Sequence, residues 1–356
     1  MFVYVGTYTG PGQGEGIYVY RLDPSSGALT HVQTVTEVDN PSFLTLHPRL
    51  PLLYAVSESG RGDQRTGGNI AAFAVDRATG MLTALNSEGT GGTGACHLTV
   101  DATEGYILVA NYGSGHVTAM PLQDDGGLGA ATDVVLHEGR GPSEERQRGP
   151  HAHFITQDPG GNYVLACDLG IDRVMVYRLD TTAGKFVPND LPYAQVSSGA
   201  GPRHLAFHPS ARYVYVINEL DSTMSAFTYD ADRGVLEIVQ TVSTLPDDFS
   251  GENTCAQIVM APSGKFVYGS NRGHHSIAIF AINEATGHLT LVGHESSRGE
   301  TPRNFNLDPT GSLLLAANQD TDTIVAFRVD AATGRLQATG EVTDVPAPVC
   351  IVYGGA

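Results

Sequence analysis

Tryptophan, cysteine and basic residues are scarce in this chain, and each scarcity excludes a class of structure or partner. There are 0 Trp among the 356 residues, so repeats built on a Trp-Asp dipeptide are excluded. Lys and Arg together number 20 against 38 Asp and Glu, which gives a formal net charge of −18. Nucleic acids and anionic membranes both select basic surfaces, so we expect neither as a partner.

The 4 cysteines are dispersed along the chain. Without the clustered spacings of a disulfide framework or a zinc site, they lie in separate apolar segments at Cys96, Cys167, Cys255 and Cys350. We therefore expect reduced, buried thiols. The opening stretch, MFVYVGTYTG, has no basic leader and too few apolar residues for a signal peptide or a membrane span, which makes the cytoplasm the expected location.

Long helical periodicity is also missing, and the chain is instead rich in Gly, with 43 residues, and in short β-type apolar runs. These runs recur in a fixed frame, in which a Pro or its substitute is followed nine positions later by a small polar residue. The pairs are Pro48 with Ser57, Ala102 with Asn111, Pro159 with Asp168, Pro209 with Asn218, Pro262 with Asn271, and Pro309 with Asn318. Extending the polar series backwards adds Thr7, because FVYVGTY aligns with YVYVINE.

The seven copies follow one another at intervals of roughly 50 residues, the length of one supersecondary unit in a repeat protein. Each copy continues through two further β-type runs separated by a turn of the form Asp-x-x-Thr-Gly-x-Leu, which indicates a hairpin with Gly in the left-handed conformation. Units made only of strands are typical of propeller blades. The sequence therefore predicts an all-β, seven-bladed β-propeller with four antiparallel strands per blade, in a single domain over residues 1–356.

The two ends of the chain complement each other in this frame. The first copy starts directly in its second strand, and an unassigned run over 349–353 remains near the C-terminus. We expect that last strand to pair into the first blade and close the ring, because an open propeller would leave unpaired sheet edges.

Two sets of equivalent positions should surround one mouth of the central channel. The position six before the Pro opens the innermost strand, and the position after the small polar residue closes the next, so the two lie side by side in an antiparallel hairpin. The first set is Ser42, Cys96, His153, Arg203, Ala256 and Arg303, and the second is Tyr8, Glu58, Tyr112, Leu169, Glu219, Arg272 and Gln319. Such unlike, ionisable residues on a symmetric scaffold indicate a binding site.

The residue types in these sets suit chemistry on an anion. Arginines can hold a phosphate or carboxylate and stabilise an oxyanion, while His153 or Glu219 can move a proton to or from water. Arg203 and Glu219 belong to one hairpin, so a purely structural ion pair is the alternative interpretation. His151 lies two residues before His153, but no third ligand has metal-site spacing, so we expect His151 to line the mouth and expect neither a metal nor another cofactor.

Several stretches resemble one family. GTYTG near the start, GPHAHF, AGPRHLAFHP followed by NEL, and SNRGHHSIAIF are similar to segments of the seven-bladed propeller lactonases, which include 6-phosphogluconolactonases and the fungal carboxymuconate-lactonising enzyme. The resemblance implies a metal-independent carboxylic-ester hydrolase that opens a lactone. The catalytic positions that it implies are His153, Arg203, Glu219 and Arg272. The chain departs from its relatives at Gln257 and Val259, where they tend to have Glu and His.

We therefore predict hydrolysis of 6-phosphogluconolactone, a step of the pentose phosphate pathway, by a monomeric enzyme acting on a small anionic lactone. In this scheme Arg272 and Arg303 hold the phosphate and Arg203 holds the carbonyl oxygen. Either His153 or Glu219 activates water. The substrate-binding positions are His151, Arg303, Tyr112, Glu58 and Gln319.

Two alternative functions stay open at this point. The first is a lactonising enzyme, or cycloisomerase, for a carboxymuconate-type acid, and the second is a non-catalytic propeller that binds a partner on its rim. The connection over 137–150, HEGRGPSEERQRGP, is longer and more charged than the others. It is either a lid that supplies Arg146 or Arg148 to an anion or a solvated loop.

Overall fold

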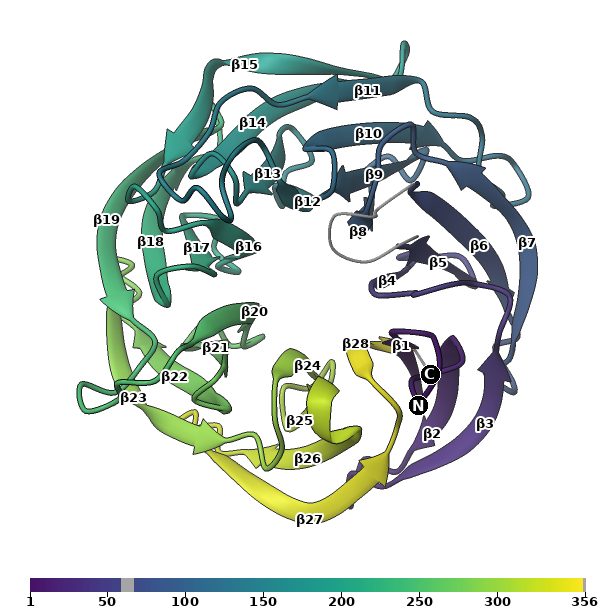
Figure 1. Cartoon of the computed structure of the whole chain (residues 1–356), viewed down its shortest axis with the longest axis vertical. Helices are drawn as coiled ribbons and strands as arrows, with labels where there is room; N and C mark the ends of the chain where they lie inside the picture. The colour runs from purple at the N-terminus through teal and green to yellow at the C-terminus, as the bar shows by residue number, and fades with distance from the viewer. Residues whose placement is uncertain (59–66, 355–356) are drawn as a thin grey trace.

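Seven antiparallel sheets of four strands each are arranged radially around a common axis in the computed structural model of the chain, which describes residues 1–58 and 67–354 (Figure 1). This arrangement confirms the predicted seven-bladed β-propeller. In each blade the first strand borders the axis and the fourth forms the outer rim. In the part of the chain that the structure describes, no helix is long and apolar enough to cross a membrane.

The blades are numbered along the chain, with strands given from the axis to the rim. Blade 1 consists of β28 (Pro348–Gly354), β1 (Phe2–Thr7), β2 (Ile17–Leu22) and β3 (Leu29–Val35), and blade 2 consists of β4 (Leu44–Leu46), β5 (Leu52–Ser57), β6 (Asn69–Val75) and β7 (Leu82–Gly89). Blade 3 consists of β8 (Ala95–Val100), β9 (Tyr106–Asn111), β10 (His116–Pro121) and β11 (Asp133–Leu136). Blade 4 consists of β12 (Ala152–Gln157), β13 (Val164–Asp168), β14 (Arg173–Asp180) and β15 (Lys185–Gln195). Blade 5 consists of β16 (Pro202–Phe207), β17 (Tyr213–Asn218), β18 (Thr223–Asp230) and β19 (Val235–Ser243). Blade 6 consists of β20 (Thr254–Met260), β21 (Phe266–Arg272), β22 (Ser276–Ile282) and β23 (Leu289–Ser296). Blade 7 consists of β24 (Pro302–Leu307), β25 (Leu313–Asn318), β26 (Thr323–Val329) and β27 (Leu336–Asp344).

The first blade is completed by the C-terminal strand, as predicted. Strand β28 pairs antiparallel with β1, with Phe2 opposite Gly354 and Val5 opposite Ile351. The two ends of the chain therefore lie side by side in one sheet (Figure 1). Pairing the ends closes the ring and leaves no innermost strand without a partner in its sheet.

The recurring small polar residues tie each blade to the one before it. Asn271 is fully buried, and its Nδ2 donates to the carbonyl of Thr244, 2.9 Å away, while its Oδ1 accepts from the Thr244 hydroxyl at 2.8 Å. Thr244 follows the outermost strand of the preceding blade. Asn111 accepts from Thr90 in the same way, at 2.7 Å. At these two positions the side chain both donates and accepts, which an amide of this size can do.

The hairpin glycines bring neighbouring blades into contact. Gly287, in the turn between β22 and β23, has φ +76°, and a Cβ there would lie 2.4 Å from the ring of Tyr213 in blade 5. The hydroxyl of Tyr215 donates to the Gly287 carbonyl at 3.0 Å. Apolar side chains of adjacent blades then form a shared core, in which Ile217 packs with Phe280. Only Gly permits both the left-handed backbone and the close approach of the ring.

Strand bulges set the direction of the site-forming side chains. In the innermost strands of blades 3, 4, 5 and 7 the pairing register shifts at Cys96, His153, Arg203 and Arg303. A bulge inserts an unpaired residue, bends the strand and re-aims the side chain. These residues are the ones that the repeat placed at the openings of the innermost strands, so a single backbone device turns all of them toward the same mouth.

Candidate active site

A cavity of about 210 Å³ lies where the openings of the innermost strands meet the ends of their neighbours. The residues that line it come from blades 2 to 7 and from the loop before β12, and they are Glu58, Cys96, Tyr112, Arg146, His153, Glu219, Thr254, Arg272 and Arg303. Seven of these nine residues belong to the two sets of positions that the repeat brought to one mouth, and an eighth, Arg146, was a candidate on the loop. Arg203 does not line this cavity but contacts Glu219.

Glu219 is the centre of the charge network. Its Oε2 lies 2.9 Å from Nε of Arg203 and 2.9 Å from Nη2 of Arg272. Its Oε1 lies 2.6 Å from Nη2 of Arg146. Burial raises the pKa of the Glu219 carboxyl, but Arg272, Arg203 and Arg146 outweigh that effect and hold the pKa below its ordinary value. Glu219 is therefore a carboxylate at neutral pH and a poor proton acceptor.

Arg203 is held by contacts with Glu219, Ala256 and His204. Its Nη1 donates to the carbonyl of Ala256 at 2.7 Å and lies 3.3 Å from Nε2 of His204. Burial, Arg272 and Arg303 lower the pKa of Arg203 to about 9, so the guanidinium still carries its charge at neutral pH. A charge held this rigidly stabilises a nearby oxyanion without reorganisation.

Arg303 differs from Arg146, Arg203 and Arg272 because its guanidinium has no hydrogen-bond or ion-pair partner among the residues that the structure describes. The guanidinium carbon lies 5.2 Å from the centroid of the Tyr8 ring, and the side chain lines the cavity. A guanidinium has five donors, and within residues 1–58 and 67–354 no side chain or carbonyl accepts from those of Arg303, so they can bind a ligand. This makes Arg303 the clearest anion-binding group in the site.

His153 presents an imidazole to the same cavity. The side chain is buried, and its Nδ1 has no hydrogen-bond partner in the described part of the chain. Burial, followed by the charges of Arg203 and Arg303, holds the pKa of His153 well below its ordinary value. The ring is therefore neutral at neutral pH and able to accept a proton.

A second layer of histidines lies behind His153. The ring of His204 lies 5.2 Å from that of His153 and 5.4 Å from that of His97, and its Nδ1 lies 2.6 Å from Oε1 of Gln257. If Nδ1 carries the proton, Nε2 accepts from Arg203. Sequence reasoning missed this layer because strict alternation would turn His204 away from Arg203, and only the bulge lets both face the axis. The departure at Gln257 supplies the partner for His204.

The predicted substrate-binding residues divide into two groups. Glu58, Tyr112 and Arg303 line the cavity, and Glu58 accepts from the Ser42 hydroxyl at 2.9 Å. His151 and Gln319 are not among the residues that line it.

His151 and Gln319 have other partners in the described part of the chain. The ring of His151 stacks on that of Tyr112, with centroids 4.5 Å apart, and its Nδ1 lies 2.8 Å from the Tyr112 carbonyl. The Gln319 amide donates to Asp320 at 2.9 Å, within the short 3₁₀ helix η2 (Gln319–Thr321). His151 thus supports a wall of the site from behind.

The 137–150 connection contributes one of its two candidate arginines. Arg146 reaches Glu219 and lies 3.3 Å from the Tyr112 hydroxyl. Arg148 instead donates to the carbonyl of Glu144 within the loop. The start of the connection is anchored by His137, whose Nδ1 lies 2.6 Å from a carboxylate oxygen of Asp168 in a fully buried pair. The connection therefore contacts the cavity through Arg146 and the blades through His137, while Arg148 bonds only within the loop among the described residues.

Thr254 was also missed, although the register contains the signal for it. It opens β20 directly opposite Arg272, so any pairing of the two strands that places Arg272 at the mouth places Thr254 there too. Beyond Thr254 and Arg272 the cavity adjoins an open hollow of about 530 Å³, lined by Glu252, Asn253, Thr254, Arg272, Gly273, His275 and Thr301. The site is thus reached through a wider vestibule.

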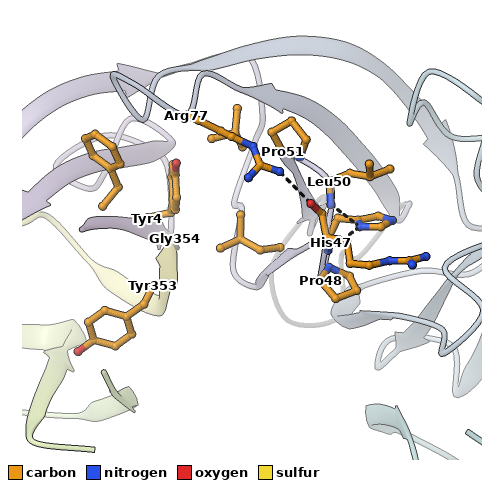
Figure 2. Close-up of a pocket in the computed structure, with 12 residues that line it drawn as sticks. Tyr4, His47, Pro48, Leu50, Pro51, Arg77, Tyr353 and Gly354 are labelled. Carbon is orange, nitrogen blue, oxygen red and sulfur yellow. Dashed lines mark hydrogen bonds between the residues drawn. The ribbon is translucent and has the colours of Figure 1, made fainter. Parts of the chain in front are cut away.

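A further cavity, of about 290 Å³, lies between blades 1 and 2 (Figure 2). It contains His47, which follows β4, whereas Ser42, whose hydroxyl donates to Glu58 of the candidate active site, precedes that strand, so the two cavities lie at opposite ends of it. The basic groups here are used internally, since Arg77 donates to the carbonyl of Arg49 at 2.8 Å and His47 Nδ1 accepts from the Leu50 amide at 3.0 Å. His47, which precedes Pro48, therefore has a structural role in this turn.

No group of three or more His, Cys, Asp or Glu side chains within residues 1–58 and 67–354 is arranged to hold a metal ion. A closed ring of seven blades with ionisable side chains gathered at one mouth of its axis defines a propeller with a candidate site for an anionic ligand.

The comparison with known proteins identifies the family. The chain matches the seven-bladed β-propeller lactonases over residues 2–353 and belongs to that family. It is 38% identical to the 6-phosphogluconolactonase of Bacillus subtilis, over 98% of this chain and 97% of that protein. The resemblance seen in the sequence motifs is confirmed.

Solved structures agree with this assignment. The periplasmic gluconolactonase of Pseudomonas aeruginosa has a TM-score of 0.93 at 30% identity, with 99% of this chain and 98% of that chain covered. A candidate 6-phosphogluconolactonase of Bacteroides fragilis has a TM-score of 0.91 at 34% identity, with the same coverage of 99% and 98%.

Proposed function

We propose that the protein hydrolyses 6-phosphogluconolactone to 6-phosphogluconate with its own side chains as the acid, base and anion-binding groups. The observation behind this proposal is that the unpartnered guanidinium of Arg303 and the neutral imidazole of His153 line one small cavity beside the Glu219 network. The name of the Bacillus subtilis relative supports the same reaction.

The arginines have different roles here from those expected from the sequence, which assigned the carbonyl oxygen to Arg203 and the phosphate to Arg272 and Arg303. Arg272 donates to Glu219 and also to the carbonyl of Cys255 at 2.7 Å, so its Nη2 is engaged within the protein. Arg303, whose guanidinium has no acceptor among the described residues, is best placed to receive the lactone carbonyl oxygen as it becomes anionic. Arg203 adds fixed positive charge behind it. Glu219 holds Arg203 and Arg272 in place.

His153 rather than Glu219 serves as the base in this scheme. Water attacks the carbonyl carbon while His153 accepts one of its protons, and the carbonyl electrons move to the oxygen that Arg303 faces. The tetrahedral oxyanion then collapses and breaks the bond between the carbonyl carbon and the ring oxygen. The protonated His153 returns its proton to that oxygen, which leaves a carboxylic acid and a hydroxyl, and the acid then releases its remaining proton to water and becomes a carboxylate.

Modest assistance is sufficient for this reaction. Sugar lactones open spontaneously in water, so orientation and oxyanion stabilisation are enough to accelerate the step. His153 is neutral at neutral pH, so one of its ring nitrogens has a lone pair that can accept the proton of the attacking water.

The direct test uses the purified protein and freshly generated 6-phosphogluconolactone, with the spontaneous rate subtracted. We expect turnover that is unaffected by a metal chelator and that falls at least about tenfold in His153→Gln. A carboxymuconate-type lactone in the same assay provides the comparison. No rate above background on any anionic lactone would contradict the enzyme assignment.

We further propose that the protein works as a monomer in the cytoplasm. The four cysteines are buried and form no disulfide among the described residues, as predicted, which suits a reducing compartment. A periplasmic relative in Pseudomonas aeruginosa makes cell fractionation the appropriate test of location. Light scattering tests the monomer, and a dimer mass would contradict it.

A further inference from the structure

The carboxylate of Glu219 has two unequal sides. Its Oε2 accepts from Arg203 and Arg272, whose side chains are 4% and 13% exposed and which belong to blades 5 and 6. Its Oε1 accepts, among the described residues, from Arg146 alone, and that side chain is 35% exposed. Two of the three cations are therefore built into the blades, while the third reaches in from a loop.

The backbone beside Arg146 is fixed, so the side chain is the part that can change partner. The neighbouring Gln147 is fully buried, and its Nε2 donates to the carbonyl of Leu169 at 2.8 Å and to a carboxylate oxygen of Asp172 at 2.7 Å. The backbone N–H of Gln147 donates to the Ser143 carbonyl at 2.8 Å and closes a turn. This anchoring presents Arg146 over the cavity at a defined position.

The exposure of Arg146 suits it to the most strongly hydrated part of the proposed substrate. A phosphate dianion is costly to remove from water, so it is expected at the open side of a site while the lactone ring enters more deeply. Arg303 also borders a small inner void with Ser42 and Phe43, which Arg146 does not reach. The two arginines therefore mark the outer and inner ends of the site.

We propose that Arg146 is the specificity residue that reads the phosphate, by exchanging Oε1 of Glu219 for a phosphate oxygen when the substrate binds. This inference rests on the proposed lactonase function. The exchange leaves no buried charge alone, because Arg203 and Arg272 keep their contacts with Oε2. The planar guanidinium can also bind a phosphate with two parallel hydrogen bonds. A lactone without a phosphate has no anionic group to compete with Glu219 for Arg146, so the contact between Arg146 and Glu219 stays in place.

The test compares two lactones that differ only in the phosphate, 6-phosphogluconolactone and glucono-1,5-lactone, in three variants. We expect Arg146→Gln to lower kcat/KM for the phosphorylated lactone, mainly through KM, and to lower the ratio of this kcat/KM to that for the other lactone roughly tenfold. Arg146→Lys should fall between. The matched control is Arg148→Gln, in the same loop but outside the cavity, which should change neither value more than about twofold.

The outcomes separate this inference from the function on which it rests. If the wild-type protein opens neither lactone, the proposed function fails. If it opens both and Arg146→Gln lowers both by the same factor, Arg146 only organises Glu219 and the phosphate-reading role is wrong. A wild-type protein with no preference for the phosphorylated lactone would overturn it as well. Thermal unfolding of Arg146→Gln confirms that the variant is folded.

Discussion

Nε of Arg203 lies 2.9 Å from Oε2 of Glu219, and the two side chains are 4% and 6% exposed. They face each other across one hairpin of blade 5, at the end that opens into the cavity. Removing either partner leaves the other as a buried charge with less compensation, and such losses destabilise proteins strongly. The pair therefore connects the stability of the fold to the chemistry of the site.

A double-mutant cycle separates these two contributions. We expect Glu219→Gln to lower the free energy of unfolding by about 3 kcal/mol, because Arg203 and Arg272 lose their counter-charge. Adding Arg203→Met should recover part of this loss, while lactone turnover stays at least about tenfold reduced in both variants. Denaturant unfolding and the lactone assay provide the two readouts. Recovery of turnover in the double variant would mean that the pair is only structural.

Arg303→Met should reduce turnover without reducing stability. The guanidinium has no hydrogen-bond or ion-pair partner among the described residues, so an apolar side chain of similar volume should leave the free energy of unfolding within about 1 kcal/mol of the wild type or raise it. Loss of the group that faces the oxyanion should lower kcat about a hundredfold. Arg335→Met, at an exposed outer hairpin, is the control. A fall in stability with turnover intact would contradict this role.

Stability should decrease between pH 7 and pH 5. Burial lowers the pKa of His97, His153 and His204, with a further contribution from Arg203 in each case. Their neutral forms are favoured in the folded state, so below the unfolded pKa of about 6.5 only the unfolded chain takes up protons. Each such histidine lowers the free energy of unfolding by up to about 1.4 kcal/mol per pH unit.

Urea unfolding at several pH values measures this slope. His204→Gln should reduce the slope by about one proton, whereas His288→Gln, at an exposed position, should leave it unchanged. Glu219 acts in a different window, because its lowered pKa gives stability that is lost only below an unfolded pKa of about 4.3. A free energy of unfolding that is constant from pH 7 to pH 5 would show that the buried histidines do not titrate on unfolding.

Gly287→Ala should destabilise the contact between blades 5 and 6. Alanine would adopt the left-handed backbone at a cost of about 1 to 2 kcal/mol and would place a Cβ 2.4 Å from the Tyr213 ring, so we expect a total loss of roughly 2 to 4 kcal/mol. Gly340→Ala is the matched control, because φ is +94° there but no atom lies within 4 Å. Equal losses in the two variants would exclude the ring contact as a cause.

Much of the fold could be predicted because its signals are local and repeated. The Pro and the small polar residue flank the second strand of each blade, and the hairpin glycines mark the turns. The number of blades and the closure by β28 therefore followed from the spacing of these residues. The meeting of Arg203, Glu219 and Arg272 also followed from their equivalent positions.

Other features of the site depended on contacts without such a period. Arg146 comes from a non-repeating loop, and the stacking of His151 behind Tyr112 depends on side-chain packing. His204 required knowledge of the bulge.

The sequence by itself determined the seven-fold scaffold and the set of ionisable residues at one mouth, because a repeat constrains which positions are equivalent. Only the tertiary structure decided how the charges are shared: Glu219 is occupied by three arginines, while Arg303 has its donors open toward the cavity. The physical reason is that hydrogen-bond partners depend on distances of a few tenths of an ångström, which bulges and packing set and residue spacing does not encode.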